Sequence, residues 1–276
     1  PNPEALGLAY NRLAAALLHL RGEEEALSLL RKEDQLIIAA NGEEHPARFH
    51  NLVDTSAVLL DTRRFAEASV LLHRALSIAA SAGMQGLPAT VVAINNLGEA
   101  EDGLGRHGEG LSRFDEALAI AERAYGPRHW MAGMLRVNRA RALLGAGRLR
   151  EALVDAERGL GVVEETLPAD HDFVGRALHG LGLVRLALCQ PARAVPPLTR
   201  AHGLLERRGT VHEVAQVRVA LAQALWSAGE PSTHVRRLAE DARDSFLAAG
   251  ARARAEEVGR WLERPRGCAG TTTHPR

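Results

Sequence analysis

The sequence predicts an all-α fold, a right-handed solenoid of about six helix pairs plus a C-terminal capping helix. Three observations support this prediction: a repeat of 42 residues, apolar residues at helical spacing, and turn signals at regular places in each repeat. Small residues on the expected second helices recur at steps of 42 without an insertion. They are Ala26, Ala68, Gly110, Ala152 and Ala194.

A matching set of small residues lies twelve positions earlier, on the expected first helices: Ala14, Ser56, Gly98, Ala140 and Gly182. A third set lies seven positions after the second-helix residues, where Ala75, Ala117, Gly159 and Ala201 are small and Glu33 is the exception. Glycine adds no side chain between packed helices. We therefore expect the backbones of the two helices to approach closely where Gly98 faces Gly110.

The clearest pair spans residues 93–126. Ile94 and Leu97 lie on the apolar stripe of its first helix, residues 105–108 form the turn, and Leu111 and Phe114 begin the stripe of its second helix. We expect one array over residues 1–250, a capping helix over 251–264 and a disordered tail over 265–276. The expected pairs are about 6–40, 47–82, 89–125, 131–166, 173–207 and 211–249.

Two irregularities interrupt the repeat. Pro191 suits a first helical position, but Pro196 and Pro197 lie close enough to the expected helix start to shorten or displace that helix. The sixth pair is out of phase, because Gly182 and its counterpart Ala222 are 40 residues apart.

Composition excludes several classes of function. The 34 basic and 34 acidic residues balance, so we expect no nucleic-acid partner, and no apolar run is long enough for membrane insertion. Two cysteines cannot form a disulfide framework, which favours a cytoplasmic location. The chain begins at Pro1 without a methionine or signal peptide, which is consistent with a piece of a longer protein.

The residues of the repeat resemble a known family. The run Asn95-Asn96-Leu97-Gly98, followed by Gly105-Arg106 and by Ala117-Leu118, is similar to the tetratricopeptide repeat (TPR), as is the run from Gly147 to Leu153. The 42-residue length and linkers such as Gly126-Pro127-Arg128-His129 resemble the kinesin light chain type of TPR. The resemblance covers about residues 6–250 and implies a non-catalytic scaffold that binds a peptide or protein segment in a concave groove.

A weaker resemblance leaves a second function open. Residues 224–262 are similar to the C-terminal TPR regions of bacterial serine/threonine protein kinases, such as those of myxobacteria. This resemblance implies a regulatory or sensing region of a larger signalling enzyme. It assigns no catalytic residue to this chain, so an enzyme in its own right is not expected.

The resemblance places ligand binding on the first helix of each pair. The residues that the helical spacing leaves exposed there are the candidate peptide-binding set: Asn11, His50, Leu60, Asn95, Glu99, Arg141, Leu144, Arg176, His179, Gln223 and Trp226. The polar members suit a peptide backbone or a carboxylate, and the apolar members suit side-chain pockets. For each residue, a solvated helix face is the alternative. The lysine and asparagine clamp of chaperone-binding relatives is absent.

Other motifs predict no chemistry. Residues 103–108 match a GxGxxG pattern, but they lie between two helices and follow no strand, so no phosphate cradle is expected. The linker histidines His45 and His171 are expected to cap helices or bond locally rather than bind a metal. Cys189 lies in a repeat turn without a histidine to activate it. We expect no metal and no cofactor.

Overall fold

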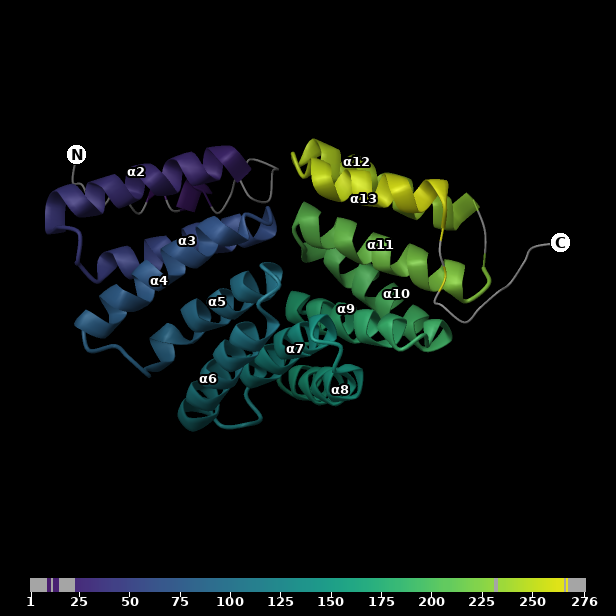
Figure 1. Cartoon of the computed structure of the whole chain (residues 1–276), viewed down its shortest axis with the longest axis horizontal. Helices are drawn as coiled ribbons and strands as arrows, with labels where there is room; N and C mark the ends of the chain where they lie inside the picture. Colours follow the sequence, from purple (N-terminus) through teal and green to yellow (C-terminus); the bar gives the residue numbers. More distant parts are fainter. Residues whose placement is uncertain (1–8, 11, 15–22, 231–232, 266, 268–276) are drawn as a thin grey trace. The chain divides into compact units, whose positions relative to one another are not determined.

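The computed structural model describes residues 9–10, 12–14, 23–230, 233–265 and 267, and within them the regular elements are helices, as predicted (Figure 1). The helices are α2 (Glu23–Asn41), α3 (Ala47–Asp61), α4 (Phe65–Ser81), the 3-10 helix η1 (Pro88–Thr90), α5 (Val91–Gly103), α6 (His107–Tyr125), α7 (Trp130–Gly145), α8 (Leu149–Thr166), α9 (Asp172–Ala187), α10 (Pro191–Arg208), α11 (Val211–Ser227), α12 (Thr233–Ala248) and α13 (Arg252–Glu263).

The chain forms two compact units, unit 1 over residues 1–127 and unit 2 over residues 128–276. In unit 1, α2 is followed by the pairs α3–α4 and α5–α6. In unit 2, the pairs α7–α8, α9–α10 and α11–α12 are followed by α13. Each helix packs mainly against its neighbours in the chain. The first helices of successive pairs also touch, α3 with α5 in unit 1 and α7 with α9 and α9 with α11 in unit 2.

The close approach predicted within the third pair is confirmed. A Cβ atom added to Gly110 would lie 2.8 Å from the carbonyl oxygen of Gly98, so the two backbones are in direct contact. In the fourth pair, a Cβ on Gly159 would lie 2.6 Å from the carbonyl oxygen of Gly133. The alanines at the repeat positions, such as Ala68 and Ala152, are fully buried. Small residues are thus required where paired helices touch.

The turn inside each pair has one residue in the left-handed backbone region. In the turns that the structure describes, Arg63, Gly105, Gly147 and Cys189 recur at steps of 42, and Gly229 follows Cys189 by 40 residues. The N–H of the next residue donates to a carbonyl five residues earlier, as from Arg106 to Glu101 at 2.9 Å, which closes the helix end. Glycine accepts this conformation without strain, whereas Arg63 and Cys189 have side chains that disfavour it.

The expectation that Pro196 and Pro197 shorten their helix is wrong. Helix α10 runs without a break from Pro191 to Arg208. Because Pro197 has no N–H, the carbonyl of Arg193 loses its usual helical donor. The guanidinium of Arg185 on α9 donates to that carbonyl instead, at 2.9 Å. Helix α9 therefore replaces the missing bond, and α10 keeps its length.

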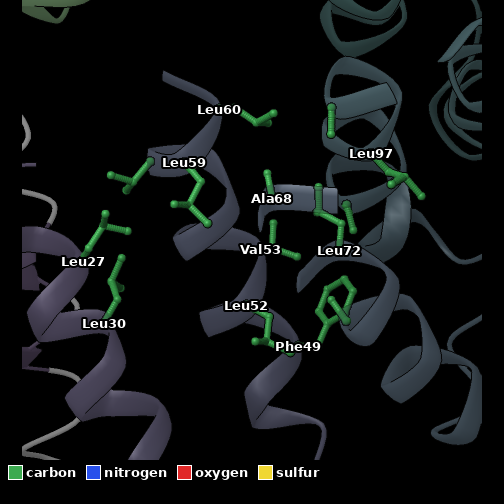
Figure 2. Close-up of a cluster of buried hydrophobic side chains, with 14 of the residues drawn as sticks. Leu27, Leu30, Phe49, Leu52, Val53, Leu59, Leu60, Ala68, Leu72 and Leu97 are labelled. Carbon is green, nitrogen blue, oxygen red and sulfur yellow. The ribbon is translucent and has the colours of Figure 1, made fainter. Parts of the chain in front are cut away.

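Unit 1 has a hydrophobic cluster to which α2, α3, α4 and α5 contribute, including Leu27, Phe49, Leu72 and Leu97 (Figure 2). The exception at Glu33 has a local explanation. Asn51 on α3 donates through its side-chain amide to the Glu33 carboxylate and to the carbonyl of Leu30, both at 2.9 Å. A polar pair thus fills the α2–α3 contact where the later repeats have small residues.

Unit 2 has its own hydrophobic cluster, formed by α10, α11, α12 and α13. The face of α13 that packs inward includes Ala255, Val258 and Leu262, which are all buried. The helix covers the apolar side of α12, as expected of a terminal cap.

Candidate functional site

The candidate residues of unit 1 lie on α3 and α5. His50 is exposed, and Leu60 is 8% exposed because it packs in the hydrophobic cluster (Figure 2). Asn95 and Glu99 are half-buried on α5, where the Asn95 amide donates to the side-chain oxygen of Asn96 at 3.1 Å. Asn11 lies outside the residues that the structure describes.

The candidate residues of unit 2 lie on three first helices. Arg141 and Leu144 lie on α7, Arg176 and His179 on α9, and Gln223 and Trp226 on α11. We call the partly exposed side chains on these helices and on α13 the first-helix surface of unit 2. It consists of Arg141, Leu144, His179, Leu183, Leu186, Gln223, Trp226, Arg254 and Trp261. Several of these side chains pack with one side on the hydrophobic cluster of unit 2.

Arg176 is already engaged within the protein. Its guanidinium lies 3.0 Å from the carboxylate of Asp172 and 2.7 Å from that of Glu213 on α11. It also lies over the ring of Phe173, with 4.9 Å to the ring centroid, and Phe173 is stacked on Trp130 of α7 at 4.9 Å. These contacts join the N-terminal ends of α7, α9 and α11. Arg176 therefore stabilises the helix stack, and a ligand would have to displace these partners.

His179 has a strongly lowered pKa. Burial, and next the positive charges of Arg141 and Arg254, lower its pKa from 6.5 to about 3. Its Nε2 atom is buried and has no hydrogen-bond partner. The imidazole is therefore neutral at physiological pH.

Helix α13 contributes two residues that the sequence reasoning assigned only to packing or overlooked. The rings of Trp226 and Trp261 meet edge to face with centroids 6.3 Å apart. Arg254 lies 5.5 Å from the ring centroid of Phe246 on α12, and its charge also reaches His179 on α9. One signal was available in the sequence. Arg254 and Trp261 are seven residues apart, which places them on the same face of a helix.

The predicted local role of the linker histidines is confirmed. The Nδ1 atoms of His45 and His171 accept the N–H groups of Ala47 and Phe173, both at 3.2 Å, at the starts of α3 and α9. His129 does the same at the start of α7, accepting from Met131 at 3.3 Å. Within the described part of the chain, no three His, Cys, Asp or Glu side chains are grouped to hold a metal ion.

The remaining motifs also lie where the sequence placed them. Residues 103–108 connect the end of α5 to the start of α6, so the glycine pattern belongs to a helix–helix turn. Cys189 is exposed in the turn between α9 and α10. No helix among the described residues has the length and apolar character to cross a bilayer.

Unit 1 has a cavity that the candidate set does not include. Its volume is about 580 Å³, and its walls come from α2, α3 and α4. Leu27, Leu52 and Val70 are among the apolar residues that line it, and Val70 is 68% exposed. The periodic spacing of first-helix residues could not indicate this cavity, because much of its wall comes from second helices.

Comparisons with known proteins agree with the fold. Residues 90–165 match the family model of the tetratricopeptide repeat. No curated protein matches the sequence. Three solved structures with similar folds have low sequence identity to this chain.

The first is a kinesin light chain protein of Podosopora anserina with nearly identical TPR-like repeats, with a TM-score of 0.53 and 20% identity over 74% of this chain and 97% of that chain. The second is a Rap protein complexed with Competence and Sporulation Factor, with a TM-score of 0.66 and 14% identity over 93% of this chain and 76% of that chain. The third is PlcR of Bacillus thuringiensis in complex with the peptide PapR7 and DNA, with a TM-score of 0.64 and 11% identity over 86% of this chain and 83% of that chain.

At these identities the similarity shows the fold alone, and the resemblance to kinase C-terminal regions stays a prediction. Residues 90–165 therefore match the tetratricopeptide repeat, and the fold is similar to that of solved TPR-like proteins, among them the kinesin light chain protein.

Proposed function

We propose that this chain is a non-catalytic interaction scaffold that binds a peptide or an extended segment of a partner protein on the first-helix surface of unit 2. The main supporting observation is the Trp226–Trp261 pair. Both rings pack on the hydrophobic cluster of unit 2 yet remain partly exposed, at the edge of a surface that also presents Gln223 and His179. Amphipathic rings with one exposed side are typical anchors for a ligand.

The rest of this surface suits a peptide. Leu183 and Leu186 on α9 offer further half-exposed apolar area. The side-chain amide of Gln223 can donate to and accept from a peptide backbone. The PlcR structure of similar fold was solved with a peptide bound, which is consistent with the proposal. The apolar anchors and the polar groups share one surface, as binding of an extended peptide requires.

Selection from a random dodecapeptide library displayed on phage, with the full chain as bait, tests the proposal. Selected peptides are then synthesised with a fluorescent label and measured by anisotropy against the wild type and two variants. Trp226→Ala removes a proposed anchor. Leu247→Ala is the matched control, because Leu247 is 52% exposed on the second helix α12. Circular dichroism confirms that both variants keep their helicity.

The expected result is at least a tenfold weaker affinity for Trp226→Ala and an unchanged affinity for Leu247→Ala. Equal affinities in both variants, or no selected peptide, would overturn the proposal. The alternative of a regulatory region of a larger signalling enzyme concerns sequence outside this chain. Sequencing the reading frame upstream of Pro1 tests that alternative, and a kinase catalytic segment there would support it.

A further inference from the structure

We propose that the cavity of unit 1 between α2, α3 and α4 binds an uncharged, mainly aliphatic small molecule that ends in a hydroxyl group. The cavity belongs to unit 1, whereas the proposed peptide surface belongs to unit 2. The inference therefore goes beyond the proposed function and does not depend on it.

The interior of the cavity is apolar. Leu27 and Leu30 on α2 extend towards α3, and Leu52 and Leu59 of α3 form the adjoining wall (Figure 2). Each of the four leucines is 4% exposed or less, whereas Val70 on α4 is 68% exposed and so lies at the opening. Water in such a cavity makes few hydrogen bonds with the walls, so an apolar ligand displaces it favourably.

The cavity has the dimensions of a small-molecule site. Its volume of about 580 Å³ lies within the range of about 300–1,000 Å³ that is usual for such sites. The lining residues extend from Leu27 to Gln35 on α2 and from Asn51 to Leu59 on α3, so each wall covers about 12 Å of helix. An elongated ligand of this length therefore contacts both walls from end to end.

Ion pairs mark the two ends of the cavity and favour a small molecule over a partner helix. Arg64, directly before α4, lies 3.3 Å from Glu24 in the first turn of α2. Towards the other end, Arg74 on α4 lies 2.5 Å from Glu44, which follows α2. A helix lying between α2 and α4 would extend past both ends and displace these pairs, whereas a molecule about 12 Å long fits between them.

The charged residues of the wall favour an uncharged ligand. Asp34 lies 2.8 Å from Arg48 and Glu67 lies 2.6 Å from Arg64, so both carboxylates already have guanidinium partners. The hydrogen bonds from Arg64 lower the pKa of Glu67, and the charge of Arg31 on α2 adds to this effect. A charged ligand would leave water for a cavity whose carboxylates are already paired, which is costly.

One end of the cavity can hold a polar group. Asn51 lines the α3 wall eight positions before Leu59, so the two side chains mark opposite ends of that wall. Asn51 is 2% exposed, and its amide nitrogen donates to the carbonyl of Leu30 and to the carboxylate of Glu33. Because both amide hydrogens are engaged, the oxygen Oδ1 is the atom that can accept a hydrogen bond from a ligand hydroxyl.

Fluorescence titration of the full chain with Nile red, an uncharged apolar dye, tests the proposal. Val70→Trp places a large ring at the opening of the cavity. The matched control is Val154→Trp, because Val154 occupies the same repeat position two repeats later on α8, is 47% exposed and does not line the cavity. Farnesol and farnesoic acid, which carry a hydroxyl and a carboxylate on the same aliphatic chain, then compete with the dye on the wild type.

We expect saturable binding of the dye to the wild type and to Val154→Trp, and at least tenfold weaker binding to Val70→Trp. Farnesol should displace the dye at concentrations at least tenfold lower than farnesoic acid. The competition uses the wild type alone, so it tests the class of ligand even where a variant fails to fold.

Three outcomes would overturn the proposal. Equal binding of the dye to both variants would place it outside the cavity, and displacement by the acid as readily as by the alcohol would refute an uncharged ligand. In sedimentation velocity without dye, self-association that Val70→Trp abolishes and Val154→Trp retains would assign the cavity to a second copy of the chain. Peptide affinity is measured separately with Trp226→Ala, so a failure here leaves the proposed function standing.

Discussion

The contact between Gly133 and Gly159 allows a stringent test of the helix packing. Gly159 and Gly161 lie two residues apart in the middle of α8, so replacing either with alanine gives the same gain in helix propensity, about 1 kcal/mol. A Cβ atom at position 161 meets nothing within 4 Å. At position 159 it would lie 2.6 Å from the carbonyl oxygen of Gly133 and 2.8 Å from Cγ2 of Val137.

Because the nearest atom at position 159 belongs to the backbone, α7 and α8 must move apart to admit a methyl group. Overpacking of this kind costs about 1–3 kcal/mol. The propensity gain is common to both variants, so the difference in unfolding free energy between Gly161→Ala and Gly159→Ala isolates this steric cost. Gly161→Ala should be more stable than the wild type by about 1 kcal/mol, and Gly159→Ala should be less stable than Gly161→Ala by about 1–3 kcal/mol.

Urea denaturation followed by circular dichroism at 222 nm measures this difference. Unit 1 offers an independent second comparison on α6. There a Cβ at position 108 meets nothing within 4 Å, and one at Gly110 lies 2.8 Å from the Gly98 carbonyl oxygen. If Gly159→Ala proves as stable as Gly161→Ala, the close contact between α7 and α8 does not exist in solution and the packing argument fails.

Three further predictions concern single sites. Because the pKa of His179 is lowered to about 3, the unfolded chain binds a proton below pH 6.5 that the folded protein does not bind, and the unfolding free energy should fall by up to about 2 kcal/mol between pH 8 and pH 5. In urea titrations, the unfolding free energy of His179→Gln should fall by correspondingly less over that range, and identical pH profiles of the variant and the wild type would contradict this. Cys189→Gly should raise the unfolding free energy by about 1 kcal/mol because it relieves a left-handed backbone with φ of 53°, whereas Cys189→Ala should not. Asn51→Ala should cost about 1–3 kcal/mol because the Glu33 carboxylate and the Leu30 carbonyl each lose the hydrogen bond that the Asn51 amide donates. Glu33→Ala should recover part of that loss in the double variant, and purely additive effects would refute the pairing.

The packing of the repeat was readily predicted because it depends on local spacing. A small residue at the same place in successive repeats identifies a helix contact without knowledge of the third dimension, and the contact of Gly98 with Gly110 confirms this. The effect of Pro197 was not predictable in the same way. Its consequence depends on Arg185, a residue of the preceding helix whose guanidinium reaches the carbonyl that the proline leaves without a donor.

The candidate site was only partly accessible to sequence reasoning. Counting positions along a helix identified His179 and Arg141 as members of one surface, but it also included Leu60, which the neighbouring helices bury. Arg254 is 75 positions from His179 and lies outside the regular repeat, so no period connects them. Only the folding of α13 beside α12 brings its charge to α9. Arg176 illustrates the converse, since its partner Glu213 on α11 becomes visible only in three dimensions.

The position of α13 has a consequence for how such an array can change over time. The same short helix shields the last apolar face of unit 2 and presents Arg254 and Trp261. Insertion of another helix pair before it would carry both side chains away from His179 and Trp226. Lengthening the array at its C-terminal end would therefore divide the first-helix surface of unit 2, unless the inserted pair supplied an arginine and a tryptophan of its own.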